Sequence, residues 1–93
     1  MKTKFLVVIE QGDENFSAYS PDVQGCIASG KTVEETLVAM RGAIEFHLEG
    51  MLENGEPLPV PRSLSTYVNQ IGEISRDDIL TGIELEIPQL VDV

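Results

Sequence analysis

YSPDVQGCIASGKTVEE, residues 19–35, is the stretch of sequence that decides the fold of this 93-residue chain. Pro21 ends a short strand, because proline has a fixed φ and no N–H to donate to a sheet. Asp22 suits a turn, because its carboxylate can accept hydrogen bonds from nearby backbone N–H groups. Gly25 can adopt a positive φ, which suits a chain reversal before a strand that begins at Cys26 or Ile27.

The second half of this stretch predicts the start of a helix. Gly30 breaks the strand that precedes it. Thr32 stands three residues before Glu35, a spacing at which the hydroxyl and the carboxylate each accept a hydrogen bond from an unpaired N–H at a helix start. The order strand, tight turn, strand and capped helix is therefore predicted within these seventeen residues.

The residues before this stretch predict two further strands. Residues 2–11 carry apolar side chains on both faces, with Phe5 and Ile9 on one and Leu6 and Val8 on the other. This pattern is typical of a central strand covered on both sides. A turn at 12–15 leads to a second strand at 16–20, and a third at 27–29 completes an antiparallel meander.

A long helix is predicted from Val33 to Asn54, with Gly55 as its C-terminal stop. One apolar stripe along it can lie on the sheet, and glutamates face away from it. The members of the stripe are Val33, Leu37, Met40, Ile44, Leu48 and Met51.

A second and shorter apolar row lies nearly opposite the first and consists of Val38, Gly42 and Phe46. One sheet cannot bury both rows, and a glycine inside a helix costs up to about 1 kcal/mol relative to alanine. Gly42 therefore either allows the backbone of a partner to approach closely or is a tolerated surface glycine beside an exposed phenylalanine.

The residues after the helix predict a proline-rich connector at 56–62 and an extension at 63–93. Residues 64–71 fit a short strand or a loop, residues 75–80 a single capped turn of helix, and residues 83–87 a last strand. The predicted fold is a single α+β domain, a two-layer β-β-β-α-β sandwich with one long helix on the sheet. Residues 1–55 form its β-β-β-α core.

Composition favours a binding protein in a reducing compartment. The net charge of −10 argues against contact with nucleic-acid phosphates and favours a basic partner, although an acidic surface also serves solubility alone. A single cysteine cannot form an intrachain disulfide, and the apolar run after Lys4 is too short for a signal peptide, so the cytoplasm is the expected location.

No constellation of residues indicates catalysis, a cofactor or a metal. His47 is the only histidine, and a packing role suits its place at the edge of the buried stripe. Cys26 has no histidine at a readable spacing and is expected to be a small buried hydrophobe. Glu10 is the only carboxylate placed as a metal site would need it, and one carboxylate is not a site. We therefore expect no enzyme.

The sequence resembles the HicB-like antitoxin family. The resemblance is carried by an aromatic residue before Pro-Asp, a Gly-Cys pair, a Gly-x-Thr-x-Glu-Glu segment and a late Gly-x-Pro-x-Pro, over about the first two-thirds of the chain. The matching residues are Pro21, Asp22, Gly25, Cys26, Gly30, Thr32, Glu35, Gly55, Pro57 and Pro59. Gln24 and Thr36 stand where the family commonly has proline and alanine.

The resemblance implies a partial RNase H-like fold and a non-catalytic protein that neutralises a small basic RNA-cleaving toxin of HicA type. The alternative is an orphan protein of this fold with an RNA-handling or other regulatory role. Many members of the family add a DNA-binding segment, and only Arg62 and Arg76 are basic after Pro61. A stand-alone member that does not bind DNA directly is therefore expected.

Two unexplained apolar surfaces predict a homo-oligomer, most simply a dimer. One is the helix row of Val38, Gly42 and Phe46, and the other is the sheet face at Leu6 and Val8. The sequence does not decide between a helix-to-helix contact and a sheet-to-sheet contact.

Overall fold

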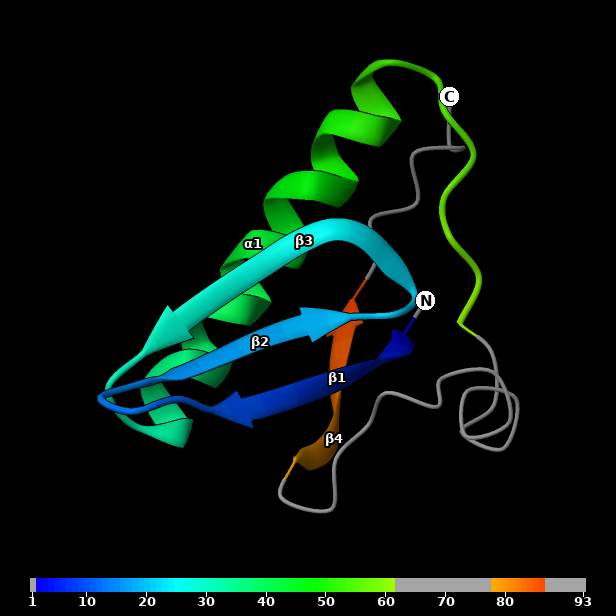
Figure 1. Ribbon diagram of the computed structural model, residues 1–93. Helices are drawn as coiled ribbons and strands as arrows, with labels where there is room; N and C mark the ends of the chain where they lie inside the picture. The colour runs from blue at the N-terminus through cyan, green and yellow to red at the C-terminus, as the bar shows by residue number, and fades with distance from the viewer. Residues whose placement is uncertain (1, 62–77, 87–93) are drawn as a thin grey trace.

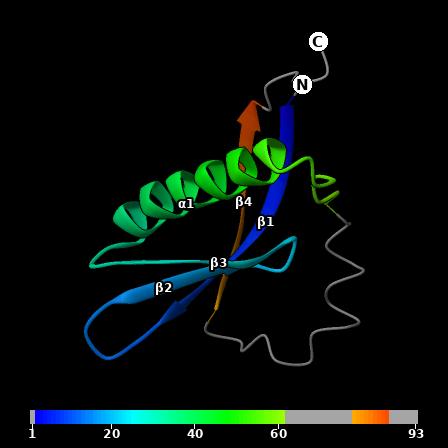
Figure 2. The ribbon, with the colours of Figure 1, turned by 90° about the horizontal axis from the view of Figure 1, so that it is seen from above.

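The computed structural model describes residues 2–61 and 78–86 as a four-stranded antiparallel sheet with one long helix (Figure 1). The sheet has the order β3-β2-β1-β4, and the helix α1 lies across one of its faces (Figure 2). The predicted α+β fold and its β-β-β-α-β order are confirmed. The elements are β1 (Lys2–Gln11), β2 (Phe16–Ser20), β3 (Val23–Gly30), α1 (Val33–Glu53) and β4 (Ile79–Glu86).

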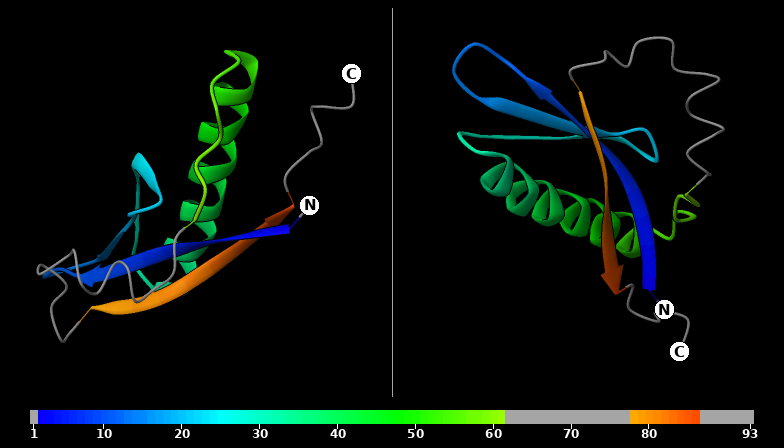
Figure 3. Two further views of the ribbon diagram at one scale, coloured as in Figure 1. Left: turned by 90° about the vertical axis from the view of Figure 1, so that its right-hand side faces the viewer. Right: turned by 90° about the horizontal axis from the view of Figure 1, so that it is seen from below.

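Strand β1 is the central strand, as its two apolar faces predict. It pairs with β2 on one side and with β4 on the other, as the two further views in Figure 3 show. Phe5, Val7 and Ile9 face α1 and are fully buried. Val8 points to the opposite face and is also 0% exposed.

The hydrophobic core lies between α1 and the sheet. The predicted helical stripe supplies its helix side, with Met40, Ile44 and Leu48 buried and Val33, Leu37 and Met51 packed at its margin. The sheet side consists of Phe5, Val7, Ile9, Ala18, Val23, Cys26, Ile83 and Leu85. This burial fixes which side of α1 faces the solvent.

The C-terminal end of α1 is closed by a glycine in the left-handed region. Asn54 is the C-cap, one residue later than the last helical residue, and Gly55 has a φ of +72°. The Gly55 N–H donates to the Leu52 carbonyl at 3.1 Å, and the Glu56 N–H donates to the Met51 carbonyl at 2.8 Å. These two bonds form a Schellman motif, which explains why the helix stops where the sequence predicts.

The N-terminal cap differs in one bond from the predicted arrangement. The Thr32 side chain accepts a hydrogen bond from the Glu35 N–H at 3.0 Å, as expected. The Glu35 carboxylate accepts from the Lys31 N–H at 2.9 Å, and not from the N–H of the cap residue. Gly30 is required at this corner, because a Cβ there would lie 2.8 Å from the Thr36 backbone nitrogen.

Two strands are longer than predicted. Strand β3 begins at Val23 and not at Ile27. The helical turn expected at 75–80 is wrong for Ile79 and Leu80, which belong to β4 and pair with Ile9 and Val8. Pairing with the buried central strand outweighs the local helical signal. The expected element at 64–71, the rest of the helical turn, and Ile87 lie outside the described residues.

Thr32→Ala is predicted to destabilise the chain by about 0.5–2 kcal/mol, because it removes the acceptor for the Glu35 N–H. Thr32→Ser keeps a hydroxyl at the cap and serves as the matched control. The measurement is the free energy of unfolding from urea titrations of the three proteins. Equal midpoints for Thr32→Ala and the parent chain would contradict the role assigned to this cap.

Candidate functional site

At the turn between β2 and β3, two backbone groups of β1 form hydrogen bonds with side chains and not with the backbone of β2. Val8 pairs with Tyr19, so the same register would set Leu6 opposite Pro21, which has no N–H. The Ser20 hydroxyl instead donates to the Leu6 carbonyl at 2.7 Å, and the Asp22 carboxylate accepts from the Leu6 N–H at 2.9 Å. We call this pair of side chains the Ser20–Asp22 brace.

A bulge follows the brace and lies inside β3. Tyr19 pairs with Ile27 and Ser20 with Val23, so β3 has three more residues than β2 between these two pairs. Gly25 is one of the three and has a φ of +83°, as predicted. The chain reverses at Pro21 and Asp22, however, and not at Gly25 as the sequence suggested.

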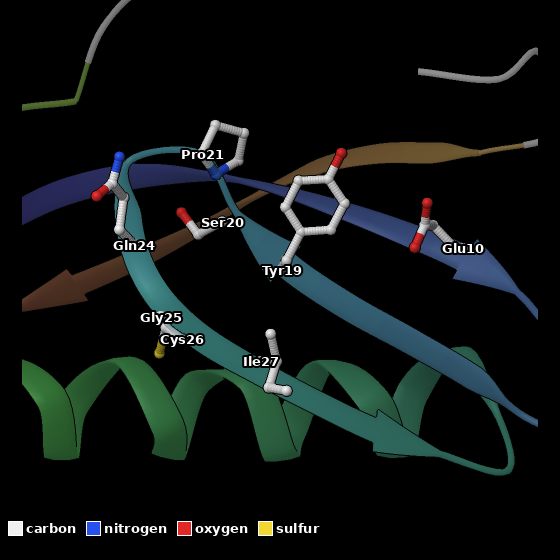
Figure 4. Close-up of a pocket in the computed structure, with 8 residues that line it drawn as sticks. All are labelled: Glu10, Tyr19, Ser20, Pro21, Gln24, Gly25, Cys26 and Ile27. Carbon is white, nitrogen blue, oxygen red and sulfur yellow. The ribbon is translucent and has the colours of Figure 1, made fainter. Parts of the chain in front are cut away.

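Tyr19 of β2 and Cys26 of β3 point to different sides of the sheet. Figure 4 shows the Cys26 sulfur pointing toward α1, whereas the Tyr19 ring points away from the helix. Cys26 is buried, and burial raises the pKa of its thiol. A thiol in this state is a poor nucleophile at neutral pH, in agreement with its predicted role as a small hydrophobe.

A shallow hollow lies on the sheet face that α1 leaves open. It consists of two adjoining cavities of ≈ 560 Å³ and ≈ 360 Å³, both lined by Glu10, Tyr19 and Ile27. These three residues come from three neighbouring strands, and Ile27 is 73% exposed. The hollow offers an aromatic ring, an aliphatic side chain and one carboxylate. Sequence reasoning missed it, because only the strand register brings these residues together.

The outer face of α1 is the second candidate surface. Val38 is 73% exposed and Phe46 is 79% exposed, and the Gly42 position between them opens to solvent. Exposed glutamates flank this row, as the spacing of Glu45 and Glu49 predicts. We call Val38, Gly42 and Phe46, with the flanking glutamates, the outer helix face.

The sheet contact suggested by the sequence has less exposed surface than the helix row. Leu6 is half-buried and Val8 is fully buried, although both lie on the face opposite α1. Val8 therefore cannot contact another protein without a rearrangement of its surroundings.

The remaining motif residues lie at two places. Gly30, Thr32 and Glu35 form the corner that leads into α1. A cavity of ≈ 290 Å³ lies at the other end of the helix. His47 and Pro59 line it, together with residues of the turn between β2 and β3. Gly55 ends α1, and Pro57 follows in the segment after it.

Within residues 2–61 and 78–86, no group of three histidine, cysteine or acidic side chains is arranged to hold a metal ion. Over the same residues, no helix has the length and hydropathy that a membrane span requires.

This fold and these exposed surfaces define a small α+β protein with surfaces suited to binding. The sequence profile of the HicB-like antitoxins of bacterial toxin-antitoxin systems matches residues 5–91, so the chain belongs to the HicB-like antitoxin family.

The chain is also similar to individual proteins of other organisms. An uncharacterised 14.9 kDa protein of Haemophilus phage HP1 is 34% identical over 87 residues, which are 94% of this chain and 64% of the phage protein. A Helicobacter pylori protein described only as UPF0150 is 41% identical over 49 residues, 53% of this chain and 67% of its own length. The chain thus spans less than two-thirds of the phage relative.

Two solved structures share the fold. A chain of the HicA3 and HicB3 toxin-antitoxin complex superposes with a TM-score of 0.72 at 26% identity, covering 91% of this chain and all of that chain. The Burkholderia pseudomallei antitoxin HicB superposes with a TM-score of 0.78 at 21% identity, covering 95% of this chain and 65% of that one. The second likeness shows the fold alone.

Asp22→Ala is predicted to destabilise the chain by about 1–3 kcal/mol, because it leaves the Leu6 N–H without its acceptor beside the sheet. Asp22→Asn retains a side-chain oxygen that can accept from Leu6 and is expected to cost less. Urea unfolding curves measure both changes. If the two variants are equally stable, the carboxylate of the brace does not have the role described here.

Gly25→Ala is predicted to destabilise the chain by about 1–2 kcal/mol, because an L-residue is strained in the left-handed region. No atom of the described residues lies within 4 Å of the added Cβ, so the loss reports backbone conformation and not a steric clash. Gly42→Ala is the matched control, since its added Cβ is also free of contacts. In the helix it should stabilise the chain by up to about 1 kcal/mol. Thermal or urea unfolding that shows the same sign for both substitutions would refute this account.

Proposed function

We propose that this chain is a non-catalytic antitoxin that binds a small basic toxin of HicA type and blocks it by occlusion. The observation that carries the proposal is the match of residues 5–91 to the HicB-like antitoxin family. The likeness to a chain of the HicA3 and HicB3 complex supports a toxin of HicA type as the partner.

The electrostatics of the chain support a basic partner. Sixteen acidic residues against six lysines and arginines give a net charge of −10. An acidic surface attracts a basic protein over a distance of about 8–10 Å at physiological ionic strength and thereby increases the rate of encounter. Direct binding to DNA is not part of the proposal, because nucleic-acid binding relies on clustered basic residues. The unpaired Cys26 supports a cytoplasmic location.

A growth assay tests the antitoxin role. A HicA-type toxin encoded beside the gene for this chain, produced from an inducible promoter, should stop growth, and co-production of the chain should restore it. Asp22→Ala is a useful control, because a variant with a weakened fold should restore growth less well at raised temperature. Toxicity that the chain does not relieve would exclude the proposed function.

The association rate between the chain and the toxin is predicted to fall about tenfold or more between low and high salt, because the attraction is screened. Stopped-flow fluorescence at several NaCl concentrations measures this rate. A rate that does not change with salt would remove electrostatic steering from the proposal.

We also propose that the chain forms a homo-oligomer, most simply a dimer. The exposed apolar side chains of the sheet, Ile27, Ile79 and Leu80, support this, since monomers seldom leave large apolar patches uncovered. Light scattering on Leu6→Glu and Phe46→Glu, compared with the parent chain, distinguishes a contact on the sheet from a contact on the helix. A parent chain that remains monomeric at high micromolar concentration would exclude self-association.

A further inference from the structure

The outer helix face combines apolar anchors with acidic side chains. Phe46 and Val38 are 79% and 73% exposed, although the helix has ample apolar surface in the core. They stand one turn on either side of Gly42, so the three positions form a continuous row. A large exposed aromatic side chain in such a row has the character of the anchors that dominate protein interfaces.

Gly42 leaves a gap in this row that the chain's own packing does not require. An added Cβ at Gly42 would meet no atom within 4 Å, so the glycine makes no close contact within the described residues. Alanine would be the more favourable helix residue at this position. The gap between Val38 and Phe46 is open to a side chain or backbone from another molecule.

The charges on α1 determine what kind of molecule fits this row. The helix carries five glutamates and a single arginine, Arg41. Arg41 is directed to the flank, where its Nη1 donates to the Glu84 carbonyl of β4 at 2.9 Å. The glutamates of the helix are all exposed and lie at Glu34, Glu35, Glu45, Glu49 and Glu53.

A second copy of the chain fits this face poorly. Two antiparallel helices crossing at Gly42 would set Val38 of one copy against Phe46 of the other, which is favourable. The same symmetry places Glu35 of each copy opposite Glu49 of the other, so this contact between like charges occurs twice. A parallel pair sets every glutamate against its own counterpart. Like charges placed together across an interface repel each other, so this face is unsuited to self-association.

From these observations we propose that the outer helix face is the surface that binds the basic partner, with Phe46 and Val38 as anchors and Glu45 and Glu49 as contacts to its lysines or arginines. The proposal rests on the proposed function and specifies the surface through which it acts. The hollow on the sheet is the competing surface, and Glu10 is the one charged side chain among the described residues that line it.

Site-specific photocrosslinking in the native host tests this choice of surface. A photoreactive phenylalanine analogue is placed at Phe46 in one variant and at Ile27 in another, two positions that are 79% and 73% exposed. The products are identified by mass spectrometry. We expect a crosslink from position 46 to a small basic protein with the sequence of a HicA-type toxin, and little from position 27.

Binding measurements with that toxin, purified, complete the test. Phe46→Ala should weaken the affinity at least tenfold, whereas Ile27→Ala should leave it unchanged. Glu45→Gln together with Glu49→Gln should lower the association rate several-fold and flatten its dependence on salt. Asp13→Asn together with Glu14→Gln, in the turn after β1, is the matched control; it also removes two exposed charges but none from α1, and should lower the rate much less. Circular dichroism and urea midpoints confirm that each variant remains folded.

Three other outcomes would contradict the proposal, each in a different way. Toxin crosslinked at position 27 and not at 46 overturns the choice of surface and leaves the antitoxin function intact. A crosslink from position 46 to a second copy of the chain overturns the proposal in favour of a helix-to-helix dimer. If neither position yields a toxin and the growth assay also fails, the proposed function and this inference both fall.

Discussion

The hydrogen bonding of Leu6 is the constraint on which the rest of the structure depends. Its N–H and carbonyl lie at the place where the register would require a bonding partner at position 21, and proline cannot donate there. Both groups are nevertheless satisfied, because the side chains on either side of Pro21 supply a donor and an acceptor. The central strand thus keeps its bonding while the neighbouring strand ends.

Ending β2 at this point is what frees β3 to follow a different path. The three extra residues of the bulge and the positive φ of Gly25 shift β3 relative to β2, so that Val23 and Cys26 enter the core against α1. The helix then starts from the corner at Gly30, where its backbone approaches too closely for any side chain. Turn, bulge and corner together determine which side of α1 packs on the sheet and which side remains available.

Those parts of the fold that depend on neighbouring residues could be predicted from the sequence. The bounds of β1 and β2 and the start of α1 follow from strand patterning and from the cap at Thr32, and the end of α1 follows from Gly55. Predictions failed where partners distant in the sequence decide. Ile79 belongs to β4 because it pairs with Ile9, and no local signal carries that information.

Of the candidate surfaces too, only the one that depends on residues close in the sequence could be predicted. The exposed row on α1 could be predicted, because the four-residue spacing of Val38, Gly42 and Phe46 sets it opposite the buried stripe. The hollow formed by Glu10, Tyr19 and Ile27 could not, since it requires the registers of three strands at once. Leu6 and Val8 were placed on the correct face, but their burial depends on tertiary packing that alternation along a strand does not reveal.

The position of β4 has a consequence for how the chain is made. Among the described residues it is the last strand, yet it pairs with β1, the first, over eight residues from Lys2 to Ile9. Until residues 79–86 leave the ribosome, one edge of the apolar central strand has no partner, and open edges of this kind invite pairing with other chains. Closure of the sheet therefore waits until β4 has been made, so the growing chain is vulnerable to aggregation up to that point.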